Sequence, residues 1–188
     1  MGQVVQFEEQ AVARLRERLG AVEEANKDLI AFARGHSDAV ASINAAVLEA
    51  IEAPSIDALF KVITRRWPDI LGIDFVAVGL IVAERGFRAD PDSIERVEPA
   101  FVARMLCGVH AVEVRSVASG HPLFGGSASA LVRAEALIRI DGPPPYPRGL
   151  LAIGQREELA ADSSHGSALL LFLGQVVAAT IRRCVANS

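Results

Sequence analysis

The sequence of 188 residues predicts an α+β fold, in which an antiparallel sheet carries helices mainly on one face. Three observations predict it: a long apolar pattern at helical spacing up to residue 52, a segment at residues 73–83 that is apolar on both faces, and two further strand-like segments before a helical C-terminus. We expect two parts. A long N-terminal helix over residues 1–52 forms a dimerising coiled coil, and a globular domain occupies residues 53–188.

The N-terminal pattern consists of positions, most of them aliphatic, at alternating spacings of three and four. They are Val12, Leu15, Leu19, Val22, Asn26, Leu29, Ala33, His36, Val40, Ile43, Val47 and Ala50. Apolar side chains repeated every 3.5 positions form the contact between the helices of a coiled coil. We therefore expect a helix over about residues 8–52 that pairs with its copy in a homodimer. The predicted dimer interface consists of Val12, Leu15, Leu19, Val22, Asn26, Leu29, Val40, Ile43 and Val47.

Three features qualify this helix. From Ile30 onward the apolar stripe widens, so we expect the second half to lie against the globular domain as well. Asn26 either fixes the register of two paired copies or is an ordinary exposed residue near a helix break. Gly35 lowers helix propensity by about 1 kcal/mol relative to Ala, so the stretch could be two helices that meet there.

A second helix is predicted to follow Pro54. Ser55 is a suitable N-cap, and apolar residues recur at helical spacing up to Gly72. Pro68 lies inside this helix and cannot donate a backbone hydrogen bond, so we expect the last turn to be distorted.

The middle of the chain alternates between apolar and turn-rich segments. Residues Ile73 to Ala83 are apolar on both faces and predict a central strand. Residues 85–99 are polar and predict a loop, and residues 99–106 predict a short helix. Residues 110–117 alternate weakly and predict a strand, whereas the Gly- and Ser-rich residues 119–129 predict a loop.

The C-terminal third predicts a hairpin and a helix. Val132 to Ile140 alternate cleanly, and Gly149 to Gly154 form a second short apolar strand. Residues 141–148 join them through a turn that contains four prolines. Asp162 to Ser164 can cap a final helix that runs to about Val185.

The most informative polar residues are Arg133, Glu135 and Arg139, our candidate ligand-binding residues. Strand alternation places all three on one sheet face. If helices cover that face, the three charges would line a cleft for an anionic or amphoteric small molecule. If water covers it, they would form a solvated cross-strand array.

Catalytic signatures are weak. The sequence has no nucleophile elbow, phosphate-binding loop or dinucleotide motif, and its four histidines lack metal-ligand spacing. Cys107 and His110 could form a thiolate–imidazole pair, although a structural cysteine explains them more simply. Asp162 to His165 include triad-type residues that helix capping also explains. We expect no enzyme activity, no catalytic residues, no cofactor and no metal.

Composition bears on compartment and partners. The formal net charge is −4 and no Lys/Arg-rich run occurs, so we expect no nucleic-acid partner. We see no signal peptide, and two cysteines without a CxxC suit a reducing cytosol. The most apolar window, residues 168–181, has about 14 residues and is too short to span a bilayer. We expect a cytoplasmic protein without membrane attachment.

An ordered set of segments resembles a known family. These are Ala33-Arg34, Ala53 to Ile56, Gly72 to Ala77, Leu106 to Gly108, Val132 to Ile140 and Gly149 to Gly154. The set is similar to the bacterial proteins catalogued as domain of unknown function 484, which resemble GAF domains. The chain departs at Glu135 and Arg139, where a small residue and Pro are expected, and at Gln155 to Glu157, where Ser and then Asp are expected.

The resemblance implies a GAF-like sheet of about five or six antiparallel strands, with the N-terminal and C-terminal helices together on one face. In related GAF modules those helices commonly form the dimer bundle, and the family brings no established activity. Two hypotheses follow. One is a dimeric regulatory or sensor module with a small-molecule pocket. The other is a ligand-free scaffold or adaptor that recruits a protein partner through its N-terminal helix. A closed polar pocket would favour the first, and a filled apolar interior the second.

Overall fold

The structure is a computed structural model that describes residues 20, 22–24, 37–82, 84–142, 147–158 and 167–186. The chain divides into two compact units, Met1–Ala41 and Ser42–Ser188. Residues 20, 22–24 and 37–52 are helical. The rest of the predicted N-terminal helix, with Val12, Leu15, Leu19, Asn26, Leu29, Ala33 and His36, lies outside the described residues and stays a prediction. The Asp162 to Ser164 cap lies outside them as well.

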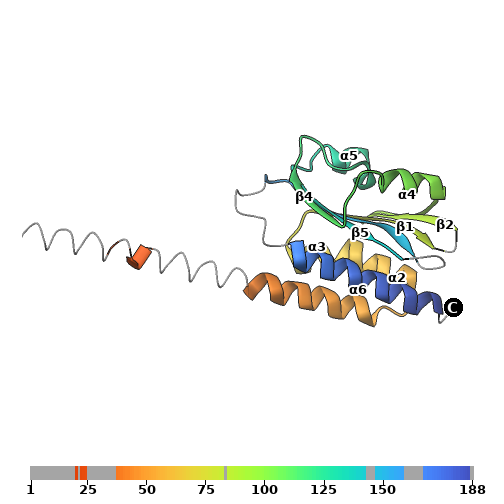
Figure 1. The fold of residues 1–188 in the computed structure, drawn as a ribbon, viewed down its shortest axis with the longest axis horizontal. Helices are drawn as coiled ribbons and strands as arrows, with labels where there is room; N and C mark the ends of the chain where they lie inside the picture. Colours follow the sequence, from red (N-terminus) through yellow and green to blue (C-terminus); the bar gives the residue numbers. More distant parts are fainter. Residues whose placement is uncertain are drawn as a thin grey trace, which may run out of the picture. The chain divides into compact units, whose positions relative to one another are not determined.

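Six antiparallel strands form one sheet in the second unit, in the order β3-β2-β1-β6-β5-β4 (Figure 1). The strands are β1 (Phe75–Val82), β2 (Arg85–Ala89), β3 (Ile94–Val97), β4 (Val112–Ser116), β5 (Ala134–Ile140) and β6 (Arg148–Gln155). The predicted central strand, the weak strand at residues 110–117 and the hairpin of β5 and β6 are confirmed. The register pairs Val78 with Leu151, and Ile138 with Leu151 on the other side of β6.

The helix after Pro54 is built from three pieces. In α2 (Ile56–Lys61) the Ser55 hydroxyl accepts the Ala58 amide at 3.2 Å, as its predicted capping role requires. A π-helical turn, η1 (Val62–Arg66), then leads into α3 (Trp67–Leu71), which has Pro68 in its first turn. Because Pro68 has no N–H to continue the regular ladder, the turn before it widens. The predicted distortion is confirmed, though it precedes the proline.

One face of the sheet, which we call the α6 face, packs against the long helices. Its buried strand residues include Val78, Leu80, Ile138 and Leu151. The final helix α6 (Ser167–Ala186), residues 42–52 and α2 cover it, and Figure 1 shows α6 lying beside the helix of residues 42–52. Arg183 joins these two helices, since its guanidinium donates to the carbonyls of Ile51 and Ala53 at 2.6 and 2.5 Å.

The prediction that the helix before Pro54 lies against the globular domain is confirmed from Ser42 onward. The same burial corrects the predicted dimer interface. Ile43 and Val47 are only 7% and 8% exposed within their own subunit, so they have almost no surface left for a second one. Their spacing marked a helix–sheet contact, because apolar residues three and four apart share a face whatever covers it. The exposed large apolar residues of this segment are Leu48 and Ile51.

The opposite face, which we call the α4 face, is also covered. Its strand residues include Ala77, Leu137, Leu150 and Ala152. The covering elements are α4 (Pro99–Met105), the 3-10 turn η2 (Pro122–Phe124) and α5 (Gly126–Ser129). The expected helix at residues 99–106 is confirmed, whereas residues 119–129, expected as a loop, contain η2 and α5. The longer helices therefore lie on one face, as expected, but shorter helices cover the other face as well.

Residues 85–99 were expected to form a loop, which is wrong. They form the hairpin of β2 and β3, which extends the sheet beyond β1. The Asp90 carboxylate closes its turn by accepting the amides of Asp92 and Ser93 at 3.0 and 2.8 Å. The residues of β3 are largely exposed. A strand without a buried face shows no alternation of apolar and polar residues, so its pattern resembles a loop.

Removing the side chain of Trp67 should destabilise the fold strongly. Trp67 is fully buried, and its indole Nε1 donates to the Ala46 carbonyl at 3.0 Å, which ties α3 to the helix of residues 42–52. We expect Trp67→Ala to lower the free energy of unfolding by about 3–5 kcal/mol, measured by urea denaturation followed by circular dichroism. Trp67→Phe keeps most of the volume and should cost less. Equal losses in both variants would contradict this packing role.

Candidate functional site

The candidate residues Arg133, Glu135 and Arg139 do share one side of the sheet, as alternation predicted. Glu135 and Arg139 belong to β5, whereas Arg133 precedes it and donates its amide to the Gln155 carbonyl at 2.8 Å. All three make contacts to the segments that cover the α4 face. Those contacts go to three different places, so the side chains do not converge on one centre.

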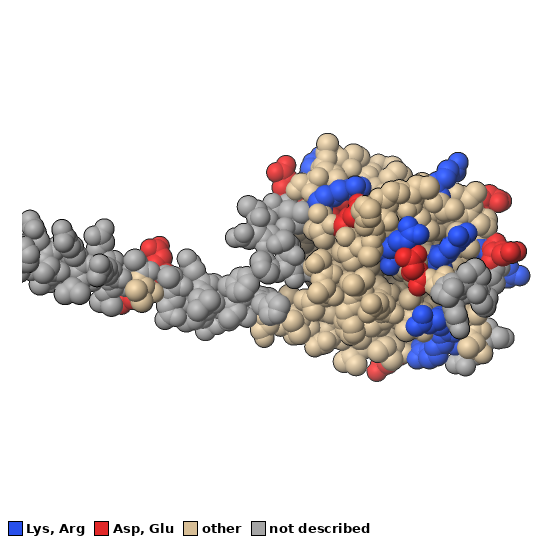
Figure 2. Space-filling model, in the orientation of Figure 1, with Lys and Arg blue, Asp and Glu red and all other residues tan. Residues whose placement is uncertain are grey.

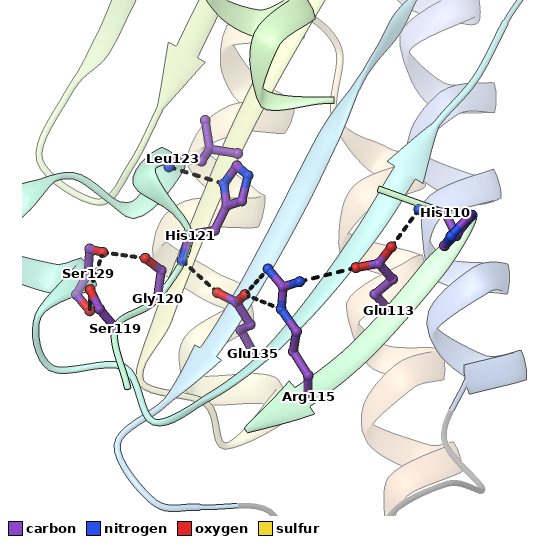
Figure 3. Close-up of polar contacts among 9 residues, drawn as sticks. All are labelled: His110, Glu113, Arg115, Ser119, Gly120, His121, Leu123, Ser129 and Glu135. Atoms are coloured by element: carbon purple, nitrogen blue, oxygen red, sulfur yellow. Dashed lines mark hydrogen bonds and ion pairs between the residues drawn. The ribbon is translucent and has the colours of Figure 1, made fainter. Parts of the chain in front are cut away.

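Glu135 is the buried centre of a polar cluster (Figure 3). Only 1% of its side chain is exposed. One carboxylate oxygen accepts the Nε and Nη2 of Arg115, both at 2.8 Å, and the other accepts the His121 amide at 2.6 Å. A buried carboxylate is tolerated only where donors replace its hydration, and these three donors do so.

Arg115 extends the cluster toward solvent. It lies directly opposite Glu135 in the register of β4 and β5, and its side chain is 49% exposed. Its Nη1 also reaches Glu113 at 3.4 Å, and Glu113 in turn accepts the His110 amide at 2.8 Å. We did not single out Arg115 from the sequence. The signal that could have found it is the pairing of two strands that each carry one charge at opposed positions.

His121 fixes the backbone beside Glu135. Its Nδ1 accepts the Leu123 amide at 3.2 Å, which caps η2 and places the ring proton on Nε2. Burial lowers the pKa of His121, while the Glu135 charge and the Met105 carbonyl oppose the shift and Arg115 adds to it. The neutral imidazole is therefore the form that this geometry stabilises.

The turn that His121 caps fills the space above the sheet. Leu123 and Phe124 are buried there. A Cβ at Gly79 would lie 3.0 Å from Leu123 Cδ1, and a Cβ at Gly154 would lie 3.0 Å from Phe124 Cζ. Two glycines on adjacent strands thus make room for these side chains. The α4 face in the described part of the chain is accordingly a packed core at this point.

Several arginines hold the segments over this core. Arg133 Nη1 donates to the carbonyls of Ala118, Ala130 and Val132 at 2.9 to 3.2 Å. Arg139 Nη1 donates to the carbonyls of Leu106 and Val109 at 3.2 and 3.3 Å. Arg88 of β2 donates to the Leu123 carbonyl at 3.1 Å. We expected the candidate residues either to line a cleft or to form a solvated array. Neither alternative included the role that these contacts show, which is to bind the backbone of the loops to the sheet.

The two cysteines lie in different parts of the domain. Cys107 is exposed, and its sulfur contacts the Ala103 carbonyl at 3.5 Å, whereas Cys184 is buried in α6. No group of three or more His, Cys, Asp or Glu residues that could hold a metal occurs in the part of the chain that the structure describes. The sequence Asp162 to His165 lies outside that part.

One hollow of about 240 Å³ occurs at the β4–β5 edge of the sheet, against α6. Arg139 is the only one of the three candidate residues that lines it. The other polar residues that line it are Asp141, Gln175 and Arg182, and none of them was selected from the sequence.

Solved structures with this arrangement define the class of fold. The chain is similar to a free methionine-R-sulfoxide reductase from Neisseria meningitidis in complex with its substrate, at 12% identity and a TM-score of 0.54, covering 78% of this chain and 89% of that one. It is also similar to the chromophore-binding domain of the bacteriophytochrome RpBphP3 from R. palustris, at 13% identity and a TM-score of 0.51, covering 79% and 61%.

A third similar structure is the N-acylhomoserine lactone dependent LuxR family transcription factor CepR2 from Burkholderia cenocepacia, at 14% identity and a TM-score of 0.52, covering 79% and 98%. Likeness at these identities shows the fold alone, which is GAF-like. The chain spans about three fifths of the phytochrome chain's length.

The sequence itself shows the particular family. The family described as "Protein of unknown function, DUF484" matches residues 1–186, and the chain belongs to it. The resemblance inferred from the ordered segments is confirmed. Comparison with curated proteins gives no match.

Replacing Glu135 by Gln should weaken the cluster without changing its shape. The amide NH₂ of Gln cannot accept a hydrogen bond, so either the Arg115 guanidinium or the His121 amide loses its acceptor. We expect a loss of about 1–3 kcal/mol in the free energy of unfolding, measured by urea denaturation. Glu113→Gln, on the same chain of contacts but nearer solvent, should cost less than about 1 kcal/mol. A larger loss for Glu113→Gln would contradict the assignment.

The lowered pKa of His121 makes stability depend on pH. Because the folded state holds His121 below its ordinary pKa of about 6.5, the unfolded chain binds more protons as the pH falls past that value. This contribution to stability is complete above the unfolded pKa and is lost as the pH falls through the folded one. Urea denaturation between pH 7.5 and 5 should show the loss.

His121→Asn is the matched control for this titration. The Asn side-chain oxygen can still accept an amide two residues ahead but has no proton to gain. As the pH is lowered, the free energy of unfolding of the parent should therefore fall relative to that of His121→Asn. A difference that is constant over the whole range would contradict the role of His121.

Proposed function

We propose that the protein is a dimeric GAF-like regulatory or sensor module, whose output face is formed by the helices on the α6 face. The observation that carries this proposal is the exposure of large apolar side chains on these helices. Leu48 is 62% exposed and Ile51 is 45% exposed, and on α6 Phe172 is 44% exposed. Large apolar side chains that remain exposed on neighbouring helices favour an interaction site.

α6 has a side that is buried in the domain and an outer side that is apolar as well. By length and composition alone it is apolar enough to cross a bilayer, and in the described chain it is the one helix of this kind. Leu173, Val177 and Ile181 are buried against the sheet, so one side of the helix belongs to the core of the domain. Figure 2 shows that uncharged surface covers the first turns of α6, whereas charged side chains gather toward its C-terminal end. We propose that another protein surface covers the outer side, with no membrane involved.

A second copy of the chain is the partner that we propose for this face. The predicted coiled coil precedes in sequence the part of the helix, from Ser42 onward, that carries Leu48 and Ile51. Two copies could continue the pairing of their N-terminal helices into a bundle with α6 from each subunit. A C₂ arrangement would bury the same patch on both subunits.

Two of the similar structures favour a regulatory module over an enzyme for this chain. A chromophore-binding domain and a lactone-dependent transcription factor both depend on a small molecule. For this chain, catalysis of the kind named by the reductase has little support, because Cys107 is exposed beyond α4 and Cys184 is buried in α6. We propose a cytoplasmic, non-enzymatic protein without cofactor or nucleic-acid partner.

The alternative is a ligand-free scaffold that recruits a protein partner through its N-terminal helix. One observation favours it: Leu123 and Phe124 fill the α4 face above Gly79 and Gly154, so the described interior there is apolar and packed. Both functions share the uncovered helical face. They differ in whether a small molecule binds to the domain.

A charge placed in the proposed dimer face should separate the subunits. We expect Phe172→Glu or Leu48→Glu to raise the dimer dissociation constant by at least about 30-fold, since interface anchors typically contribute 2 kcal/mol or more. Light scattering and sedimentation at micromolar concentration measure this. Leu131→Glu is the matched control, because Leu131 is 46% exposed near the α4 face. A monomeric parent chain, or equal effects of all three variants, would overturn the proposal.

A further inference from the structure

β4 lies at one edge of the sheet and pairs, among the described strands, with β5 alone. An edge strand presents a row of backbone N–H and C=O groups to which another strand can bind. The last three residues of β4 are exposed, and Val114 at its centre is 36% exposed. This edge is therefore a surface on which a further strand can be added.

The hydrogen bonds to β5 show which residues of β4 direct their backbone outward. The Arg139 amide donates to the Ala111 carbonyl at 3.0 Å, and the Val117 amide donates to the Arg133 carbonyl at 2.8 Å. In an antiparallel pair every second residue faces its neighbour in this way. The odd-numbered residues of β4 therefore face β5, and Val114 directs its N–H and C=O away from the sheet.

One register of β4 against its own copy satisfies both the backbone and the charges. An added antiparallel strand must oppose outward residues to outward residues, which a two-fold axis at Val114 achieves. Val114 then lies opposite itself in a hydrogen-bonded pair, and Glu113 of each strand lies opposite Arg115 of the other. A shift by two residues opposes Glu113 to Glu113 or Arg115 to Arg115, and like charges at opposed positions destabilise a sheet.

Arg115 can contribute to this pairing without giving up its present contacts. Its Nε and Nη2 bind Glu135 at 2.8 Å, whereas its Nη1 lies 3.4 Å from Glu113 Oε2. The side chain is 49% exposed, and Glu113 and Arg115 project from the same side of β4 (Figure 3). In the register centred on Val114 the opposed charged residues form a non-hydrogen-bonded pair, in which side chains are closer together. Nη1 therefore has a second carboxylate beside it.

The other edge of the sheet lacks this complementarity. In β3 the Ser93 carbonyl accepts the Asp90 amide at 3.0 Å, so the residues that direct their backbone outward are the even-numbered ones. The two registers that would pair most of β3 with its copy oppose Glu95 to Glu95 or Arg96 to Arg96. Charged residues on an edge strand normally prevent pairing in this way.

We propose that β4 binds β4 of a second copy of the chain, antiparallel and about a two-fold axis at Val114, so that the two sheets become continuous. This interface is separate from the helical dimer face and does not rest on it. A pair of five-residue strands buries little surface, so we expect weak association through this edge. A chain that uses both faces has two isologous contacts and can assemble beyond a dimer.

A symmetric disulfide tests the register. Residues opposed in a hydrogen-bonded pair have Cα atoms about 5.5 Å apart, which a disulfide can bridge. In a Cys107→Ser background, which removes the exposed thiol, Val114→Cys should cross-link to its copy about tenfold faster than Ile94→Cys, because pairing raises the effective thiol concentration. Ile94 is the matched control, since it is 38% exposed on the opposite edge. Non-reducing electrophoresis measures the rate, and circular dichroism checks the fold. Equal rates would overturn the proposal.

Two further variants separate the backbone from the charges. Val114→Pro removes an outward N–H, which an edge strand tolerates, and should abolish the association that sedimentation detects in a Phe172→Glu background, whereas Val114→Thr should keep it. Glu113→Arg should slow the Val114→Cys cross-link by about threefold or more, because it opposes two arginines. Association unaffected by Val114→Pro would overturn the edge contact. A cross-link unaffected by Glu113→Arg would overturn the register, and one to a different protein would overturn the second copy as partner.

Discussion

Burial of the central strands on both faces is the constraint on which the rest of the structure depends. β1 and β6 pair along seven residues, from Phe75 opposite Gly154 to Ile81 opposite Arg148. Nearly every residue of both strands is buried. Strands of this kind cannot face water, so each face of the sheet needs a cover. α6 and its neighbours meet that need on one face, and α4 with η2 on the other. The polar contacts described above hold these covering elements on the sheet.

The two covers are held in different ways. On the α6 face the contact is mainly apolar, and the Trp67 indole and the Arg183 guanidinium each bind backbone carbonyls of the covering helices and the segment after them. On the α4 face the covering elements are short, and a helix of fewer than about two turns has little stability of its own. Charged side chains compensate for this: Glu135, Arg139 and Arg88 each bind backbone of the covering segments. The charges that suggested a ligand site are largely used in this way.

Much of the sheet could be predicted from the sequence because its central strands carry an unambiguous apolar signal. β1 and β5 have buried faces, and the burial of a face produces the apolar pattern in the sequence. The hairpin of β2 and β3 lacks that signal because β3 is exposed. The sequence also could not tell whether Ile43 and Val47 meet a sheet or a second helix, because either partner selects the same spacing.

The candidate site was harder to predict for a related reason. Glu135 was selected correctly as unusual, but its partners come from residues that are 20 and 14 positions away. Strand register decides whether Arg115 meets it, and register follows from the pairing of the whole β4–β5 ladder. The hollow on α6 escaped notice because it is defined by the small residues Gly174, Ala178 and Ala111. An absent side chain leaves no pattern in a sequence.

α6 connects the sheet with the proposed dimer face, and its contacts argue that the helix moves as one body. Gln175 and Arg182 border the hollow, whereas Phe172 lies on the outer side of the same helix. The helix is fixed to the sheet by the close approach of Gly174 to Ile138 and to residues 51–53 by Arg183. With contacts at both places, a displacement of α6 relative to the sheet would also move Phe172. By thermodynamic reciprocity, a ligand that bound the domain differently in two positions of α6 would change subunit pairing by the same free energy by which pairing changes ligand binding.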